Sequence, residues 1–444
     1  MRIAFVGAGA GNAYCGACHR DVSLVLGLRG KGNDVLFMPF YTRLTTEAED
    51  PTNGPLFCGG INAYLQQAIP LFRKTPRWMD RLWDMDFLLR FASRFAVKTS
   101  PEALGDMTVS VLQGERGFQR KELERLVQHL SDHGPFDAVY LTNSLLSGLV
   151  PMLKKKLDIP ILCGLQGEEE FLSRLKETHR REARDWLQKN CQQVDQFHAP
   201  HGAYAAKMAL FLGLPRDRFH VVPPGVDTAQ YPLRDERAAG ASESKEKRDK
   251  PFQIAFVGRL SPEKGLLFLA EALSKMDAKD LVAADLASSL WRLVVAGTGD
   301  RKAAKEHLSD VEYALSEGGG LVPVAFHGEI SLQEKVRLLH SCDLFCQPSL
   351  FPEQRAMSSL EALCCGIPVV APTSGIFPEL AKKTGAVLLF DPGDSSGLAQ
   401  NLQRACRERD QWTQQGRRAS QVIRDHYCME AAVDAVLEGL EKIL

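Results

Sequence analysis

The sequence predicts an α/β protein in which two Rossmann-like, doubly wound units follow one another along the chain. Three observations predict this fold class. Short apolar segments typical of buried strands alternate with helical segments in both halves. The chain opens with a strand and a glycine loop, MRIAFVGAGAG, and a second opening of this kind, QIAFVGRL, begins at Gln253. Residues 235–250 contain five acidic and five basic residues and indicate a solvated linker.

This pattern sets the expected domain boundaries. We expect a first domain over residues 1–234, a linker over 235–250, a second domain over 251–425 and a terminal helix over 426–444. The terminal helix is expected to pack back across the domain junction. Ligands of open α/β sheets bind at the carboxyl ends of the strands, so a cleft faced by both domains is the expected ligand site.

The first domain is predicted to begin with a βαβ unit. Its strands are expected at residues 3–8, 34–40, 137–142, 159–165, 197–200 and 219–227. Its helices are expected at residues 21–30, 120–133, 147–157, 168–190 and 203–212. Gly7, Gly9 and Gly11 are similar to a dinucleotide fingerprint, but the third glycine comes one residue early. A nicotinamide site is therefore not expected.

A segment over about residues 41–118 interrupts this alternation and is rich in aromatic residues and arginine. Residues 72–98 within it contain seven Lys or Arg, with apolar residues at helical spacing. Two interpretations stay open. The segment is an insertion packed on its own domain, or it is a basic amphipathic element that contacts a membrane surface or an acceptor.

The second half repeats the alternation of strands and helices. Its strands are expected at residues 253–260, 291–297, 324–330, 343–349 and 368–372. Its helices are expected at residues 266–276, from 301, at 332–341, from 358 and from 398 to the end. The order matches that of a second doubly wound unit.

Two carboxylates, Glu353 and Glu361, lie in the stretch FPEQRAMSSLEALCCGIP. Ser358 is followed three residues later by Glu361, which predicts a capping box that opens a helix. Glu353 would then lie in the preceding loop, beside free N–H groups that favour anions. On spacing alone, a capping role competes with a nucleotide-sugar site, whose hydroxyls would donate to carboxylates while its diphosphate needs N–H groups and cations.

Arg259 and Lys264 lie five residues apart in GRLSPEKG, a loop between an expected strand and an expected helix. An arginine can donate two hydrogen bonds to one phosphate and a lysine adds a mobile charge, so the pair suits a diphosphate. Alone, these two cations are better explained as solvated loop charges. The loop over residues 373–379, TSGIFPE, also follows a strand of this half and fits an anion.

In this order, VVPPGVD, GRLSPEKG, the Glu-x7-Glu stretch and TSGIFPE resemble the retaining glycosyltransferases of family 4, which have the GT-B fold. The resemblance is strong over about residues 195–400 and weaker before them. It implies that Arg259 and Lys264 bind the donor diphosphate and stabilise the leaving nucleotide. It further implies that Glu353 contacts the transferred sugar near the reaction centre and that Glu361 holds the ribose. Further expected donor contacts are Gly9, Gly11, Gly328, Ile330, Ser358 and Gly375.

The resemblance implies a hexosyltransferase that moves a sugar from a nucleotide-diphosphate donor to a glycan or lipid-linked acceptor, with retention and without a cofactor or metal. The departing phosphate would accept the acceptor's proton. The chain departs from the family at residues 354–356, Gln-Arg-Ala in place of Gly-Phe-Gly, and at Asn143 and Gln166 in place of histidines. A nucleotide-sugar-binding protein without transfer is therefore the alternative. His198 and His201 either touch the acceptor or are structural.

Composition limits the remaining possibilities. A formal net charge of -1 gives no field that attracts nucleic acid. No run of 18 apolar residues and no export signal is recognised, so we expect a cytoplasmic protein with reduced cysteines, with peripheral contact at the inner membrane face as an option. Cys15, Cys18 and His19 fit buried thiols or half of a zinc site.

Overall fold

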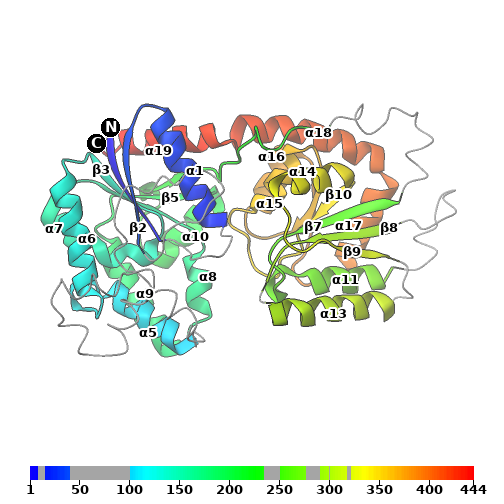
Figure 1. The fold of residues 1–444 in the computed structure, drawn as a ribbon, viewed down its shortest axis with the longest axis horizontal. Helices are drawn as coiled ribbons and strands as arrows, with labels where there is room; N and C mark the ends of the chain where they lie inside the picture. The colour runs from blue at the N-terminus through cyan, green and yellow to red at the C-terminus, as the bar shows by residue number, and fades with distance from the viewer. Residues whose placement is uncertain (9–15, 41–100, 235–250, 277–290, 300, 318–321) are drawn as a thin grey trace. The chain divides into compact units, whose positions relative to one another are not determined.

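The computed structural model describes residues 1–8, 16–40, 101–234, 251–276, 291–299, 301–317 and 322–444. These residues form two compact units, each with its own sheet and helices (Figure 1). The first unit comprises Met1–Pro223 and Ala432–Leu444, and the second comprises Pro224–Ala431. The expected linker at 235–250 and the basic segment at 72–98 lie outside the described residues.

The first unit contains a parallel sheet of six strands in the order β2-β1-β3-β4-β5-β6. Its strands are β1 (Arg2–Gly7), β2 (Asp34–Pro39), β3 (Ala138–Leu141), β4 (Ile161–Gly164), β5 (Gln196–Ala199) and β6 (Phe219–Val221). The order changes direction between β1 and β3. β6 is shorter than the expected strand at 219–227 because Pro223 and Pro224 have no N–H to donate.

The helices of the first unit follow the expected alternation. They are α1 (Gly16–Gly30), α5 (Pro101–Leu112), η2 (Gly114–Arg116), α6 (Arg120–His133), η3 (Ser144–Leu149), α7 (Val150–Leu157), α8 (Glu168–Ser173), α9 (Glu177–Cys191), α10 (Gly202–Leu212) and η4 (Arg216–Arg218). The single helix expected at 168–190 is wrong. Lys176 has an extended backbone, with ψ 147°, and divides it into α8 and α9.

The expected insertion at 41–118 is too long at its carboxyl end. α5 begins at Pro101, and its residues Val109, Val111 and Leu112 are buried in the core of the first unit. Asn190 Nδ2 of α9 donates to the Leu112 carbonyl at 2.8 Å. The residues from about 101 onwards therefore belong to the domain itself.

His198 lies inside the first unit and has a structural environment. Only 2% of the residue is exposed, and its Nε2 atom is 2.9 Å from Gln196 Oε1. Its ring centroid is 5.4 Å from that of Tyr140 and 5.8 Å from that of His220. Gly439 of α19 (Met429–Glu441) packs against the same ring, since a Cβ there would be 2.7 Å from Nε2. The terminal residues from Ala432 thus cover β5.

We expect His198 to make the protein acid-sensitive. Burial lowers its pKa well below the usual range, and the neighbouring charges of His220 and Arg20 lower it further. The unfolded chain takes up this proton below about pH 6.5 while the folded chain resists it, so stability is complete above that pH and falls below it. The loss should reach up to about 1.4 kcal/mol per pH unit for one proton.

Urea unfolding at pH 7.5, 6.5 and 5.5 measures this slope. His198→Gln should flatten the stability decline between pH 6.5 and 5.5, whereas His426→Gln, at an exposed histidine of the second unit, should leave it unchanged. An equally steep decline in His198→Gln and the parent protein would rule out His198 as the source.

The second unit contains another parallel sheet of six strands, in the order β12-β11-β10-β7-β8-β9. Its strands are β7 (Phe252–Val257), β8 (Trp291–Ala296), β9 (Val324–Phe326), β10 (Leu344–Cys346), β11 (Val369–Pro372) and β12 (Val387–Phe390). Here the order changes direction between β7 and β10. Each element expected in this half is present, although the strands are shorter than the apolar runs that predict them.

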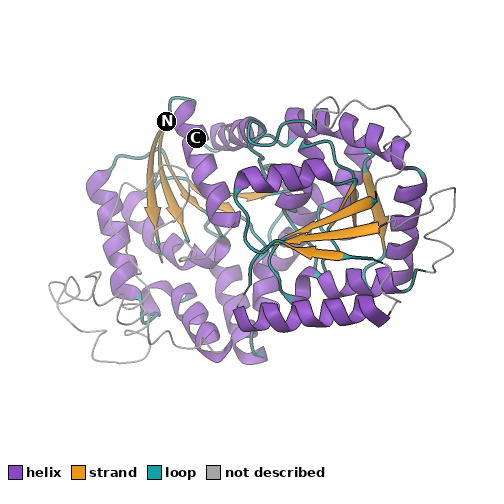
Figure 2. Ribbon diagram, turned by 45° about the vertical axis from the view of Figure 1, so that its right-hand side comes forward, coloured by secondary structure: helices purple, strands orange, loops and turns teal. Residues whose placement is uncertain are grey.

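Helices cover both faces of the second sheet (Figure 2). They are η5 (Pro262–Lys264), α11 (Leu266–Ser274), α13 (Arg301–Glu317), α14 (Leu332–Ser341), α15 (Met357–Cys364), α16 (Phe377–Thr384), α17 (Ser395–Arg407) and α18 (Arg409–His426). No helix among the described residues combines the length and apolar character needed to cross a membrane.

The boundary expected at residue 234 falls eleven residues earlier in the structure, after Pro223. Val226 pairs with Cys428 in a short parallel bridge, and its N–H donates to the Tyr427 carbonyl at 2.7 Å. Arg234 N donates to the Cys365 carbonyl at 3.1 Å. Residues 224–234 are therefore tied to the second unit by backbone pairing, which the sequence pattern does not reveal.

Candidate functional site

The loops after β7 and β10 carry the charged residues of the candidate site. These strands are neighbours in the sheet although β8 and β9 lie between them in the chain. The strand order changes direction at this pair, which is where open α/β sheets bind ligands. Leu350 N, after β10, donates to the Glu263 carbonyl, after β7, at 2.9 Å. The backbone thus joins the two loops.

Lys264 and Glu353 form an ion pair in these loops, with 2.5 Å between Nζ and Oε1. The same oxygen accepts hydrogen bonds from Ser349 Oγ at 2.7 Å and Gln347 Nε2 at 3.3 Å. The two side chains are only 16% and 11% exposed. Three donors on one oxygen fix the carboxylate, and its Oε2 atom is left as the oxygen available to a ligand.

Arg259, the other expected cation, differs from Lys264. Its side chain is exposed, and it forms no ion pair within the described ranges of the chain. Leu260 N, the next residue, donates to the Thr298 carbonyl at 2.8 Å and holds the loop against the one after β8. The loop thus presents an exposed guanidinium beside a lysine whose charge is already shared with Glu353.

The capping box expected at Ser358 and Glu361 is wrong. α15 begins at Met357, and its N-cap residue is Ala356, which makes no side-chain cap. Ala356 has φ 45° and ψ 45°, a left-handed conformation that is unusual for any residue except glycine. This turn sets the helix start one residue before Ser358, so Ser358 is half-exposed in the first turn and its hydroxyl caps nothing.

Glu361 consequently lies in the second turn of α15, where it is free of a capping role. It is 9% exposed and forms an ion pair with Lys335 of α14. Lys335 Nζ also lies 5.6 Å from the centre of the Tyr231 ring. A true capping box occurs at the start of α14, where Ser331 and Glu334 exchange hydrogen bonds.

Gly375 brings the loop after β11 against the Glu353 backbone. Its φ is +63°, and a Cβ there would lie 2.1 Å from the Glu353 carbonyl oxygen. Ile376 N donates to that same carbonyl at 2.9 Å. Glycine is the residue that permits this approach, so Gly375 supports the position of Glu353 through the backbone.

Gly328 and Ile330 lie in the loop after β9. Gly328 has φ +66°, and its carbonyl accepts a hydrogen bond from Gly297 N at 2.8 Å. Ile330 is half-buried and packs against the apolar core of the unit. Both residues lie at the carboxyl ends of β8 and β9. This is the edge of the sheet at which a ligand was expected to bind.

Gly9 and Gly11, the expected contacts of the first unit, lie outside the described residues. The loop begins at Ala8, whose N–H donates to Thr142 Oγ1 after β3 at 3.2 Å. The Thr142 carbonyl in turn accepts a hydrogen bond from Gln166 Nε2 at 2.6 Å. The ends of β1, β3 and β4 are thus linked by polar contacts.

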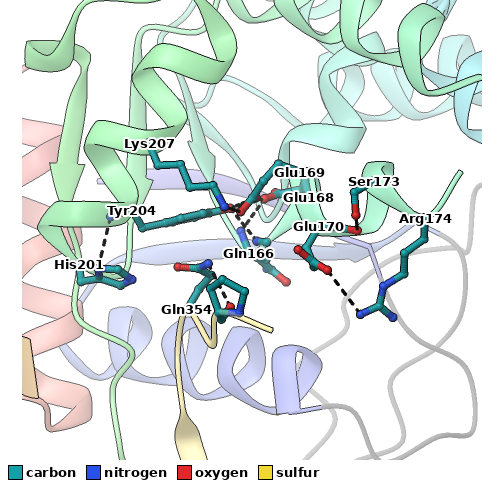
Figure 3. Close-up of polar contacts among 12 residues, drawn as sticks. Gln166, Glu168, Glu169, Glu170, Ser173, Arg174, His201, Tyr204, Lys207 and Gln354 are labelled. Atoms are coloured by element: carbon teal, nitrogen blue, oxygen red, sulfur yellow. Dashed lines mark hydrogen bonds and ion pairs between the residues drawn. The ribbon is translucent and has the colours of Figure 1, made fainter. Parts of the chain in front are cut away.

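Glu168 is a buried carboxylate at the start of α8, and Figure 3 shows it among its polar neighbours. It accepts hydrogen bonds from Ser144 N at 2.9 Å and Gln166 N at 2.7 Å. Burial raises its pKa, and these two N–H groups oppose that rise. Glu168 therefore braces the loops after β3 and β4 against each other.

The remaining polar side chains of this cluster are also engaged (Figure 3). Tyr204 donates its hydroxyl to Glu169 at 2.6 Å, and Lys207 forms an ion pair with Glu169 at 2.9 Å. His201 caps α10, because its Nδ1 atom accepts from Tyr204 N at 3.3 Å. His201 is 2% exposed, so this contact gives it a structural role.

Several site residues were missed by the sequence analysis, namely Lys335, Gln347, Ser349, Glu168, Tyr204 and Lys207. Each acts by pairing with a residue distant in sequence or by bracing a loop. Gln347 and Ser349 could have been found, since they follow β10 directly and come shortly before Glu353. Lys335 carries no such signal, because its partner lies on another helix.

No group of three or more histidine, cysteine or carboxylate side chains among the described residues could hold a metal ion. Cys15 lies outside the described residues, and the side chains of Cys18 and His19 do as well. Six of the described thiols are buried as core residues, namely Cys163, Cys191, Cys342, Cys346, Cys364 and Cys365, and Cys406 and Cys428 are half-buried. Burial raises the pKa of Cys342 to about 12, which makes its thiolate scarce.

Two family profiles match the chain. The profile described as glycosyl transferases group 1 matches residues 240–422, and the profile described as glycosyltransferase family 4 matches residues 106–230. The matched 183 and 125 residues together span more than two thirds of the 444.

Similar proteins include a D-inositol 3-phosphate glycosyltransferase of Rhodococcus opacus, 31% identical over 43% of this chain and 41% of that protein. A phosphatidyl-myo-inositol mannosyltransferase of Mycobacterium leprae is 30% identical over 34% of this chain and 36% of its own. The chain spans under half of the length of these curated relatives.

Solved structures share the fold over the full length. HepE of Anabaena in complex with UDP has a TM-score of 0.67 at 16% identity and covers 100% of both chains. Sucrose-phosphate synthase of Thermosynechococcus elongatus has a TM-score of 0.65 at 15% identity and covers 100% of this chain and 98% of its own. At these identities the similarity establishes the architecture.

Proposed function

The chain belongs to the group 1, family 4 glycosyltransferases with the GT-B fold, and from this we propose that it transfers a sugar from a nucleotide-diphosphate donor to an acceptor hydroxyl, with retention of configuration. The proposed donor sugar is a hexose, and the proposed acceptor is a glycan or a lipid-linked compound. Two relatives are named for inositol phosphate and for phosphatidyl-myo-inositol. Inositol phosphate and phosphatidylinositol are therefore the first acceptors to test.

The observation that carries the proposal is the Lys264–Glu353 pair, together with the exposed Arg259 in the same loop as Lys264. A diphosphate is a dianionic ligand that exchanges readily for a carboxylate as the partner of a lysine. When Lys264 turns to the phosphate, Glu353 is left with Ser349 and Gln347 and with oxygens that can accept sugar hydroxyls. One rearrangement would thus form both the phosphate site and the sugar site.

The proposed reaction needs little chemistry from the protein. The bond from the anomeric carbon to the phosphate oxygen breaks, and a bond to the acceptor oxygen forms on the same face. The acceptor proton passes to the departing phosphate oxygen. Arg259 and Lys264 stabilise the charge that develops on the phosphate, which is the largest contribution expected.

Two polar side chains that follow β4 of the first unit, Gln166 and Glu169, are poorly suited to act as a general base. Gln166 is neutral and cannot act as a base near pH 7. Its Nε2 atom donates to the Thr142 carbonyl. Glu169 is already paired with Lys207 and Tyr204. Neither residue is therefore proposed as the group that deprotonates an acceptor.

A second candidate function is donor binding without transfer. Gln354, Arg355 and Ala356 favour it, because they replace the Gly-Phe-Gly typical of the family. Ala356 has a positive φ, a conformation that glycine adopts without strain. This backbone is compatible with both candidate functions, so the assays below are needed to distinguish them.

The test is a thermal-shift screen of UDP-, GDP- and ADP-sugars, followed by transfer and hydrolysis assays with the donor that stabilises most. A ligand at one hundred times its Kd should add about 2.7 kcal/mol to the folded state. Stabilisation with turnover supports the enzyme, and stabilisation without turnover for any tested acceptor supports the binding protein. Absence of stabilisation by every nucleotide sugar would refute both.

A further inference from the structure

Lys335 is a sheltered lysine of the second unit that has no role in the proposed reaction. It lies in the first turns of α14 and forms an ion pair with Oε2 of Glu361. The two side chains are only 20% and 12% exposed. Removing two charges from water is costly, so the stability of this sheltered pair depends on close geometry between the ammonium and the carboxylate.

We infer that Lys335 is a positioning residue for the nucleotide ribose, acting through Glu361. The inference rests on the proposed function. Lys335 engages one carboxylate oxygen, which leaves Oε1 of Glu361 to accept a hydrogen bond from a ribose hydroxyl. Without the lysine, the carboxylate can rotate and its preferred direction is lost.

The surroundings of Lys335 restrict its movement. The capping box of Ser331 and Glu334 fixes the start of α14, and Lys335 N donates to the Ser331 carbonyl at 2.9 Å. The ammonium group also lies over the Tyr231 ring, which is 6% exposed. A cation held between an aromatic face and a carboxylate occupies a defined position.

A matched pair elsewhere in the second unit provides a control. Arg409 and Asp343 form an ion pair at 2.7 Å, with side chains 25% and 10% exposed. Asp343 precedes β10, and its Oδ2 atom accepts from Gln253 N at the beginning of β7. This pair therefore lies at the amino ends of the strands, on the edge opposite the candidate site.

The experiment measures Kd for UDP, GDP and ADP and for the 2′-deoxy form of each, with Lys335→Met and Arg409→Met beside the parent protein. For the nucleoside diphosphate bound most tightly, the parent should prefer the ribose form at least about fivefold, within the range of one hydrogen bond. Lys335→Met should reduce this preference to less than about twofold. Arg409→Met should keep the preference for the ribose form, even though its stability should fall as much as that of Lys335→Met.

Each result has a distinct meaning. A preference retained in Lys335→Met, or absent from the parent protein, overturns the role of Lys335 while the proposed function stands. Failure of the parent to bind any nucleoside diphosphate refutes the proposed function and the inference together. Should Lys335→Met fail to fold, Lys335→Gln keeps a hydrogen-bond donor without the charge, and the same ratio is measured on it.

Discussion

Replacing Lys264 by alanine should lower sugar transfer by about 10²- to 10³-fold, the range found when one preorganised donor to a developing negative charge is removed. The lysine is expected to stabilise the departing phosphate, so the loss should fall mainly on kcat. Stability should fall by no more than about 2 kcal/mol, because Glu353 keeps its hydrogen bonds from Ser349 and Gln347. Release of labelled nucleoside diphosphate and thermal unfolding measure the two effects.

Two variants make this prediction specific. Arg259→Ala should also lose turnover but keep its stability, since the exposed Arg259 forms no ion pair within the described part of the chain. Lys382→Ala removes an exposed lysine near the end of α16 and should change neither property. Sugar transfer by Lys264→Ala within about threefold of the parent would remove Lys264 from the reaction.

Replacing Gly375 by alanine should damage both stability and activity. The new Cβ would lie 2.1 Å from the Glu353 carbonyl oxygen, and the φ of +63° is unfavourable for alanine by about 1 kcal/mol. Relief of the clash requires a backbone shift in one of the two loops. We expect a total loss of roughly 3 kcal/mol and a fall in transfer of at least about tenfold.

Gly385 provides a control that separates the effect of backbone strain from the effect of a steric clash. It has φ +64° at the end of α16, but no atom lies within 4 Å of the position that a Cβ would occupy there. Gly385→Ala should therefore cost only about 1 kcal/mol and leave transfer unchanged. If the two alanine variants lose stability and activity equally, the contact between Gly375 and Glu353 does not support the site.

The helix of the Glu353–Glu361 stretch shows where sequence reasoning reached its limit. The spacing of Ser358 and Glu361 predicts a capping box, yet Ala356 ends the loop in a left-handed conformation and starts α15 earlier. Ala356 is 4% exposed and belongs to the buried core of the second unit. Capping patterns describe local preferences, and packing against the core overrode this one.

The candidate site also combines residues that the sequence predicts with contacts that it does not predict. Arg259, Lys264, Glu353 and Gly375 were expected from motifs, and the structure places their loops at neighbouring strands of one sheet. The pairing of each glutamate with a particular lysine was not expected. Ion pairs between residues 89 or 26 positions apart leave no periodic signal, because they depend on which loops the sheet order brings together.

The amino-acid sequence by itself determined the fold class, the order of nearly all elements and the family, because strand and helix periodicities and ordered motifs are local properties. The tertiary structure alone decided three matters. Backbone pairing of Val226 with Cys428 moved the domain boundary. The left-handed Ala356 freed Glu361 from capping. The change of strand order between β7 and β10 joined Lys264 to Glu353, since non-local contacts are set by how strands assemble.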